Sequence, residues 1–430
     1  MSASHPRTTS ERSDDIPLLL HQLQQLQLAE VIDAHLPSPH GNRQGLSYGQ
    51  LSVVFLSYIM SQADHRLCAV EAWSTQHLQT LTIGTGWPIK AKDASDDRLG
   101  ALVEVIGGQV ESREQIEQQL GQRMIQAYEL PTEIARCDTS SFSVYHQIDK
   151  SEEGSSLLRF GYSKDHRPDL RQYRQLLGTL DPAGVPLVSE TLAGNGADDP
   201  IYVSTWERLV EVVGHKDFIY IADSKAAAHQ TRAQLAAAGG RYCFPLPQTG
   251  QTPALLKSWV LNSPSPWQEI RLPHSVEAEP ALGVGFEMPL GKLRHQSETD
   301  TAFQWLERYL VVRSQALAQR QQKGLHQRLN NAEQALSKLA AKPLKDHCVL
   351  KTKVQTLLKR YRVSALFTTE ICIEPVTRYI GPGRPRAQDT SRQIVEPQFQ
   401  LQFERHADAI AEAEQLAGWR IYVTNLTLEQ

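Results

Sequence analysis

EIARCDTSSFSVY, residues 133–145, is the stretch that decides the fold, and LLRFGYSKDHRPDL, residues 157–170, follows it after a short loop. The run Ile134–Cys137 predicts a strand that ends on an acid, Asp138. Downstream, the apolar and β-rich run 218–222 also ends on an acid, Asp223. Two such strands can bring two carboxylates to one edge of a sheet. Hard, oxygen-preferring cations such as Mg²⁺ need a site of that kind.

The composition is that of a soluble globular protein with several domains. The chain has 430 residues, of which 40% are apolar and 21% charged, and its net charge is −4. Its five cysteines form no CxxC pair, which argues against a zinc site or a disulfide framework and is typical of a reducing cytosol. No apolar run approaches the ~18 residues of a membrane span. Residues 1–15 are polar, lack the apolar core of a signal peptide and are expected to form a disordered leader.

Residues 16–130 are predicted to form a helical domain. Leucines recur at helical spacing through LLLHQLQQLQLAEVI (18–32), and Ser47 is a candidate N-cap for a buried helix over 46–60. Further helices are expected to start at Ser95 and at Ser112. Such a domain either has no activity of its own or serves DNA-end recognition or dimerisation.

From Glu133 the pattern changes to strands. Strands are predicted at 134–139, 157–162, 175–181, 185–192, 217–222 and 242–246, with helices from the loop at 194–200 to about 213 and at 224–238. This order predicts an α/β core whose sheet mixes antiparallel and parallel pairing.

The C-terminal third is unusually basic in one segment. Residues 245–289 are expected to be loop-rich, and 303–362 to form a helical pair with a break at Lys342-Pro343. That pair contains 13 Lys or Arg against 3 Asp or Glu. Such a charge excess is either a solvated face or a surface that binds a polyanion. Arg384 and Arg386 flank a proline in a glycine-rich turn, which suits either a minor-groove arm or a flexible basic loop. A strand at 398–404, a helix at 408–416 and a final strand at 419–425 follow.

Three local strings resemble bacterial insertion-sequence transposases of the DDE type. They are CDTSSF (137–142), GYSKDHRPDL (161–170), and GNGAD (194–198) followed by IADS (221–224). The second is highly specific. The resemblance covers nearly the whole chain from Ile16 and is strongest over 133–247. It implies an RNase-H-like core at 131–247 and 417–430, with an N-terminal helical domain and a largely helical, basic insertion at 248–416.

The resemblance also implies a chemistry. Asp138 and Asp223 match the first two acids of the triad and would bind two Mg²⁺ ions, with Mn²⁺ as a substitute. Taken alone, an Asp at a strand end more often caps a turn or helix. Lys164, His166 and Arg167 would face DNA phosphates, the alternative being a loop of ion pairs with Asp165 and Asp169. The implied partners are double-stranded terminal repeats, target DNA and a second subunit in a synaptic dimer, in the bacterial cytoplasm at the nucleoid.

The chain departs from the pattern at the third acid. The Glu is expected on a helix after the last core strand, with Tyr, Arg and Lys around it, whereas this sequence stops at Gln430. Glu429 lies too close to the strand, so no residue of the chain is assigned to that role. Three hypotheses follow: a transposase whose third acid lies beyond this chain, a truncated DNA-binding product that inhibits or pairs with full-length subunits, and a nuclease of the same fold without joining activity.

Overall fold

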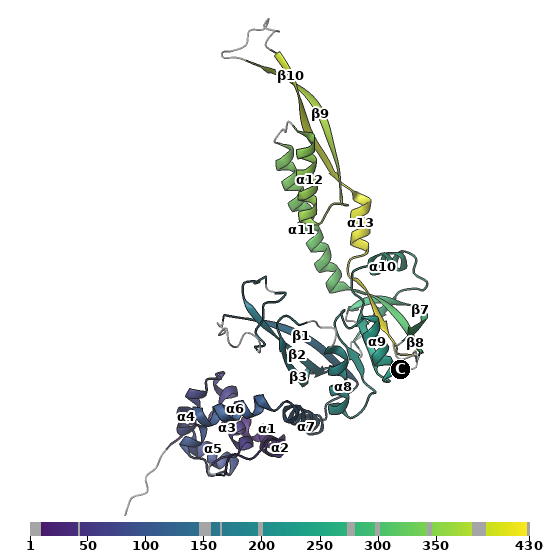
Figure 1. Ribbon diagram of the computed structural model, residues 1–430. Coiled ribbons are helices and arrows are strands. Elements are labelled where there is room, and N and C mark those ends of the chain that lie inside the picture. Colours follow the sequence, from purple (N-terminus) through teal and green to yellow (C-terminus); the bar gives the residue numbers. More distant parts are fainter. Residues whose placement is uncertain are drawn as a thin grey trace, which may run out of the picture. The chain divides into compact units, whose positions relative to one another are not determined.

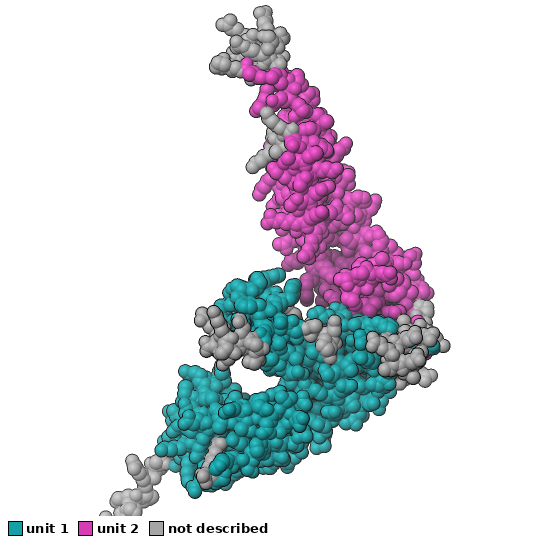
Figure 2. Space-filling model, viewed as in Figure 1, with its two compact units in different colours: residues 1–244, 293–305, 425–430 teal, residues 245–292, 306–424 magenta. Residues whose placement is uncertain are grey.

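The computed structural model describes residues 10–41, 44–145, 156–163, 166–196, 201–272, 280–296, 302–341, 346–380 and 393–427. Lys164, Arg384, Arg386 and the break at Lys342-Pro343 lie outside these ranges. The protein is a mixed α/β structure with two compact units (Figures 1 and 2). Unit 1 comprises Met1–Phe244, Leu293–Trp305 and Asn425–Gln430; unit 2 comprises Pro245–Lys292 and Leu306–Thr424. No helix in the described ranges is both long and apolar enough to cross a membrane.

The first part of unit 1 is helical, as predicted. It contains α1 (Ile16–Gln25), α2 (Leu28–His35), α3 (Tyr48–Gln62), α4 (Leu67–Gln76), α5 (Leu78–Thr85), the 3₁₀ turn η1 (Ala91–Ala94), α6 (Asp96–Gly108) and α7 (Val110–Tyr128). The Ser47 cap is confirmed, because its hydroxyl accepts from the Gln50 N–H at 3.1 Å. The helical spacing over 18–32 corresponds to two helices, because Gln27 takes a left-handed conformation (φ 50°) and separates α1 from α2.

Helices α2 and α3 cross so closely that one position must be glycine. A Cβ built on Gly49 would lie 2.0 Å from the carbonyl oxygen of Ala29, a backbone atom that cannot rotate away. The Gly49 N–H also donates to Asp33 Oδ1 at 2.7 Å, which fixes the crossing point. The crossing therefore depends on backbone packing rather than on long side chains.

The second part of unit 1 is a sheet with the strand order β3-β2-β1-β4-β5. Its strands are β1 (Ile134–Val144), β2 (Arg171–Leu180), β3 (Val185–Ala193), β4 (Ile219–Ile221) and β5 (Arg241–Pro245). The first three pair antiparallel, whereas β4 is parallel to both β1 and β5. The predicted mixture of antiparallel and parallel pairing is confirmed.

One helix follows β3 and another follows β4: α8 (Ile201–Val213) and α9 (His229–Ala237). Leu209 of α8 lies against Gly178 of β2, and Leu209 is fully buried. The face of the sheet that α8 covers presents buried Ala135, Cys137 and Leu176. Burial of this kind stabilises by roughly 1.5–3 kcal/mol for each large apolar side chain.

Two strand predictions need correction. Residues 157–162 do not form a strand: only Arg159 makes a bridge, with Gln172, because β3 pairs with that edge of β2 from Tyr173 onward. Asp138 does not end its strand either. The strand β1 continues to Val144, because the polar segment after Asp138 pairs with β2 residue by residue.

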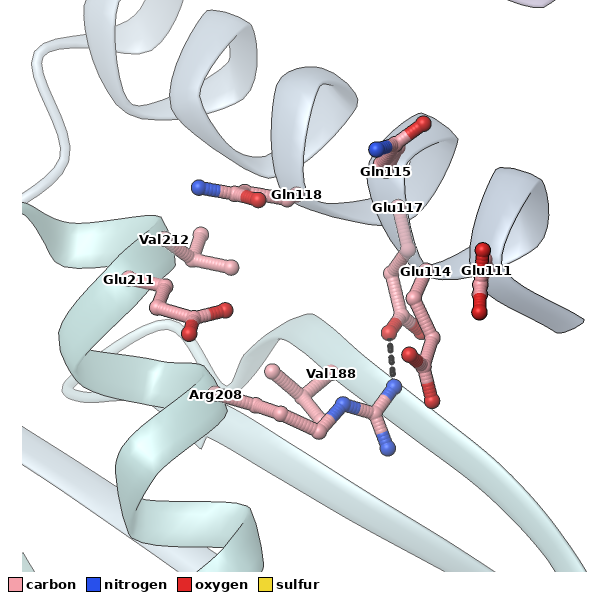
Figure 3. Close-up of a pocket in the computed structure, with 9 residues that line it drawn as sticks. All are labelled: Glu111, Glu114, Gln115, Glu117, Gln118, Val188, Arg208, Glu211 and Val212. Carbon is pink, nitrogen blue, oxygen red and sulfur yellow. Dashed lines mark hydrogen bonds and ion pairs between the residues drawn. The ribbon is translucent and has the colours of Figure 1, made fainter. Parts of the chain in front are cut away.

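A polar contact ties the helix α7 to the sheet. The Glu117 carboxylate accepts from the backbone N–H of Ser189 in β3 at 2.5 Å and from its hydroxyl at 2.8 Å. It also pairs with Arg208 of α8, and Figure 3 shows these two side chains pointing toward one another. They line a cavity of about 310 Å³ in which Glu111 and Glu114 also lie. Glu117 therefore links three elements of unit 1.

Unit 2 combines several long strands with a long helical pair. Its elements are α10 (Thr252–Leu261), β6 (Gln268–Ile270), β7 (Gly283–Gln296, which extends into unit 1), β8 (Ala302–Ser314, which begins there), α11 (Gln315–Ala340), α12 (His347–Tyr361), β9 (Phe367–Tyr379), β10 (Gln393–Arg405), α13 (Ala407–Gln415) and β11 (Trp419–Thr424). Strands β11, β8, β7 and β6 are neighbours in that order. Helices α11 and α12 lie side by side, and β9 and β10 form a two-stranded ribbon (Figure 1).

The helical pair, β10, α13 and β11 are confirmed, but two predictions for this unit are wrong. Residues 303–314 belong to the strand β8 rather than to a helix, since their aromatic and β-branched side chains alternate as a strand requires. The segment 245–289 is less loop-rich than expected. It contains α10, whose Leu256 and Val260 are buried with Trp419 and Ile421.

Replacing Gly49 by Ala is expected to destabilise the helical part of unit 1 by about 1–3 kcal/mol, because the new methyl group collides with the Ala29 carbonyl. Gly100→Ala is the matched control. Gly100 lies inside α6 with open space around its Cβ position, so this change should stabilise by roughly 0.5–1 kcal/mol. Urea unfolding of both variants measures the difference. Equal effects of the same sign would contradict the close crossing of α2 and α3.

Candidate active site

The register of β1 and β4 brings the two predicted acids to matching positions. Arg136 pairs with Ile221 across these parallel neighbours. Asp138 lies two residues beyond Arg136 within β1, and Asp223 lies two residues beyond Ile221, just after the end of β4. Adjacent strands are about 4.8 Å apart, so the register puts the two acids at corresponding positions of neighbouring chain segments. The strand β4 ends at Ile221 whereas β1 continues, and this difference leaves both aspartates exposed.

Hydrogen bonds fix one oxygen of each carboxylate. Asp223 Oδ1 accepts from the Tyr202 hydroxyl at 2.6 Å and from the Lys225 N–H at 3.0 Å. Asp138 Oδ1 accepts from the Thr139 N–H at 2.7 Å. These hydrogen bonds orient both carboxylates.

Tyr202 is a residue that sequence analysis missed. It begins the first turn of α8, is buried, and points its hydroxyl at Asp223. Its own carbonyl accepts from the Tyr220 hydroxyl of β4 at 3.1 Å. These two hydrogen bonds hold the start of α8 to the end of β4. No sequence signal distinguishes Tyr202 from an ordinary core tyrosine.

A buried cysteine lies between the two aspartates and the core. Burial raises the pKa of the Cys137 thiol, and the negative charges of Asp138 and Asp223 raise it further, although Tyr220 and Thr205 hydrogen-bond to its sulfur. The thiol therefore stays protonated at neutral pH and serves as a packing group.

The chemistry of this pair suits a hard divalent cation. Two neighbouring carboxylates repel one another until a cation neutralises them, and carboxylate oxygens are the ligands that Mg²⁺ prefers. Within the described residues, no group of three or more His, Cys, Asp or Glu side chains is placed to hold a metal ion. Asp138 and Asp223 remain the two acids that the sequence predicts as metal ligands.

The predicted phosphate-facing residues lie elsewhere on the sheet. Arg167 pairs with Asp169 at 2.7 Å and donates to the Tyr145 hydroxyl at 3.1 Å. Tyr145 follows the far end of β1, seven positions beyond Asp138. His166 precedes Arg167 in a left-handed conformation (φ 57°). The ion pair with Asp169 is the alternative that the sequence left open for this loop.

Comparisons with known proteins yield weak structural neighbours. A comparison of the sequence with models of protein families finds no match, and a comparison with curated proteins finds none either. Among solved structures, a piggyBac transposase synaptic complex with hairpin DNA aligns with 67% of this chain at 11% identity and a TM-score of 0.31. The alignment spans 60% of that transposase chain.

The Mos1 transposase aligns in two structures. Its paired-end complex with the left transposon end matches 52% of this chain and 65% of its own at 12% identity, with a TM-score of 0.19. Its strand transfer complex matches 60% of this chain and 83% of its own at 11% identity, with a TM-score of 0.18. All three scores lie below 0.5, so these likenesses carry no argument about function.

Tyr202→Phe is expected to weaken Mn²⁺ binding about tenfold, because Asp223 loses the donor that orients it. Loss of free Mn²⁺ signal in electron paramagnetic resonance titrations measures this affinity. Tyr58→Phe is the matched control, since Tyr58 also donates to an aspartate, Asp64, at 2.6 Å but does so in the helical part. The control should retain full Mn²⁺ affinity. A similar loss in both variants would mean that Tyr202 acts through general stability.

Proposed function

We propose that this chain is a metal-dependent transposase of the insertion-sequence type, which cuts and joins DNA phosphodiesters at the ends of a mobile element. The observation that carries the proposal is the parallel register of β1 and β4, in which Asp138 and Asp223 each follow the paired residues Arg136 and Ile221 by two positions. The strand order β3-β2-β1-β4-β5 also agrees with an RNase-H-like core, which the resemblance of the three sequence strings implies.

Each residue of the site then has a role. Asp138 and Asp223 would hold Mg²⁺, and Tyr202 and the Lys225 N–H would orient the Asp223 carboxylate. Bound Mg²⁺ would supply the activation of water or a DNA 3′-hydroxyl and the stabilisation of the leaving oxygen. The expected partners are double-stranded terminal repeats and target DNA, with a second copy of the chain in the synaptic complex. We assign no residue of this chain to the third acid.

Phosphate contacts would come from basic residues outside the carboxylate pair. His166 and Arg167, together with Lys164, are proposed to contact phosphates of the DNA backbone. Arg384 and Arg386 are proposed to enter the minor groove of the DNA. Such contacts position DNA without reading its sequence.

Asp138→Asn and Asp223→Asn are each expected to lower Mg²⁺- or Mn²⁺-dependent cleavage of a duplex carrying the element's terminal repeat by at least 10²-fold, because one metal ligand loses its charge. Asp217→Asn is the control: Asp217 precedes β4, is exposed and pairs with Arg241. It should cleave as the parent does. Gel assays of strand cleavage measure the rates, and parent-like cleavage by both site variants would overturn the site assignment.

A second candidate function, DNA binding without catalysis, is favoured by the helical pair of unit 2. The exposed basic side chains of α11 and α12 make no ion pair with a described acidic residue. They are Arg320, Lys323, Arg328, Lys338, Lys351, Lys353, Lys359 and Arg360. Two nearby acids are paired, Glu333 with Arg405 and Glu414 with His326. This leaves a net positive surface, which would displace counterions from DNA phosphates.

Replacing Lys353 and Arg360, which lie seven positions apart on one side of α12, by Gln should reduce the salt dependence of DNA binding. Each lost phosphate contact lowers the slope of log affinity against log salt by about 0.9, so a change of roughly two is expected. The control replaces Lys257 and Arg271, which pair with Glu412 and Glu269. Its slope should stay near that of the parent. Fluorescence anisotropy over a salt series gives both slopes, and an unchanged slope for α12 would exclude this surface.

A further inference from the structure

The far end of the β1–β2 ladder exposes a group of aromatic side chains, here called the aromatic platform. It consists of Phe142, Tyr145, Phe160, Tyr162 and Tyr173. Four of them are strongly exposed: Phe142 by 46%, Tyr145 by 77%, Phe160 by 55% and Tyr162 by 87%. Single exposed aromatics are common on soluble proteins, but several gathered at one place mark an interaction site.

At this end of the sheet, polar side chains are buried on one face and aromatic side chains are exposed on the other. On the covered face Gln172 and Arg174 are buried, at positions of β2 where apolar side chains would add stability. On the opposite face Phe142 stacks on Tyr173 with ring centres 5.3 Å apart and an interplanar angle of 17°. Polar groups inside and aromatic groups outside reverse the usual pattern of a strand with one buried face.

The buried polar residues hold the platform in place. The Gln172 amide donates to the carbonyl oxygens of Gly194 at 2.9 Å and Tyr162 at 3.1 Å. Arg159 and Gln172 exchange two backbone hydrogen bonds, at 2.8 and 3.0 Å. These bonds fix the segment that carries Phe160 and Tyr162 against β2. The rings therefore lie on an anchored segment.

Guanidinium groups already stack on two of the rings. The Arg167 guanidinium lies 5.6 Å from the centre of the Tyr145 ring, and that of Arg171 lies 4.8 Å from the centre of the Phe160 ring. Two of the exposed rings therefore each have a guanidinium group beside them. Flat apolar rings combined with positive charge match a polyanion whose bases are unstacked.

We propose that the aromatic platform binds unpaired DNA bases by stacking. In a duplex the base faces are covered by their neighbours, so rings of this kind have access only where a strand is opened. Phe142 lies four residues beyond Asp138 on the same face of β1, about 14 Å along the strand. That length is about four nucleotides at the 3.4 Å rise of a DNA strand. Resting on the proposed function, the platform would hold the opened strand next to the phosphodiester that is cut.

The test uses the full chain and a single-stranded 12-nucleotide DNA with one 2-aminopurine, whose fluorescence falls when it stacks on a ring. The parent should quench this probe and bind it at least tenfold more tightly than the same sequence as a duplex. Tyr145→Ala, Phe160→Ala and Tyr162→Ala should each weaken binding about tenfold, and the triple variant by 10² or more. Tyr128→Ala is the matched control, because Tyr128 is also exposed (44%) but lies on α7.

The outcomes separate this proposal from the proposed function. The parent should bind the single strand equally well in EDTA, without Mg²⁺ or Mn²⁺, whether or not it cleaves DNA when a metal ion is present. Parent-like binding by the triple variant would overturn the proposal. The proposal would also be overturned if the triple substitution lowered the mass of the protein measured by sedimentation without changing DNA binding, since the platform would then bind a second copy of the chain. Circular dichroism melting of each variant establishes that it is folded.

Discussion

The parallel pairing of β1 with β4 is the constraint on which the rest of the site depends. It extends over three residue pairs, from Ile134 with Ile219 to Arg136 with Ile221. Parallel strands place equivalent residues at the same height, so the acids that follow are level with one another. An antiparallel arrangement with the same hydrogen bonds would separate them to opposite ends. The carboxylate pair is a consequence of strand direction and register rather than of a local motif.

A second layer of contacts gives the pair its orientation. Tyr220 is fully buried, and its hydroxyl reaches the backbone of Tyr202, which in turn reaches Asp223. Core packing, helix start and carboxylate are thus joined in one chain of hydrogen bonds. The helix α7, which packs against α8, is attached through Glu117 to β3 and α8. Polar contacts of defined geometry therefore join the helical part of unit 1 to its sheet.

Some of this was predictable from sequence and some was not. Apolar runs that end in aspartate identified β1 and β4, and Ser47 identified the start of α3, because these signals are local. The extension of β1 to Val144 was not predictable: the residues from Thr139 to Ser143 are mostly polar, and only pairing with β2 makes them a strand. The strand β8 was mistaken for a helix because its charged residues mask the alternation. Tyr202 was missed since its role exists only once α8 packs next to β4.

The same β1–β4 pairing has a consequence for how the chain folds. Ile134 and Ile219 are 85 positions apart (219 − 134), whereas β2 and β3 are joined by the four-residue turn at 181–184. Closing the longer loop costs more chain entropy, and contacts between distant residues form slowly. The β2–β3 hairpin is therefore expected to form early. The strand β1 would then pair with β2, and β4 would be added to β1 afterwards. The protein would then be able to bind metal only at the end of folding. Partly folded chains would expose the aromatic platform before Asp138 and Asp223 are brought together.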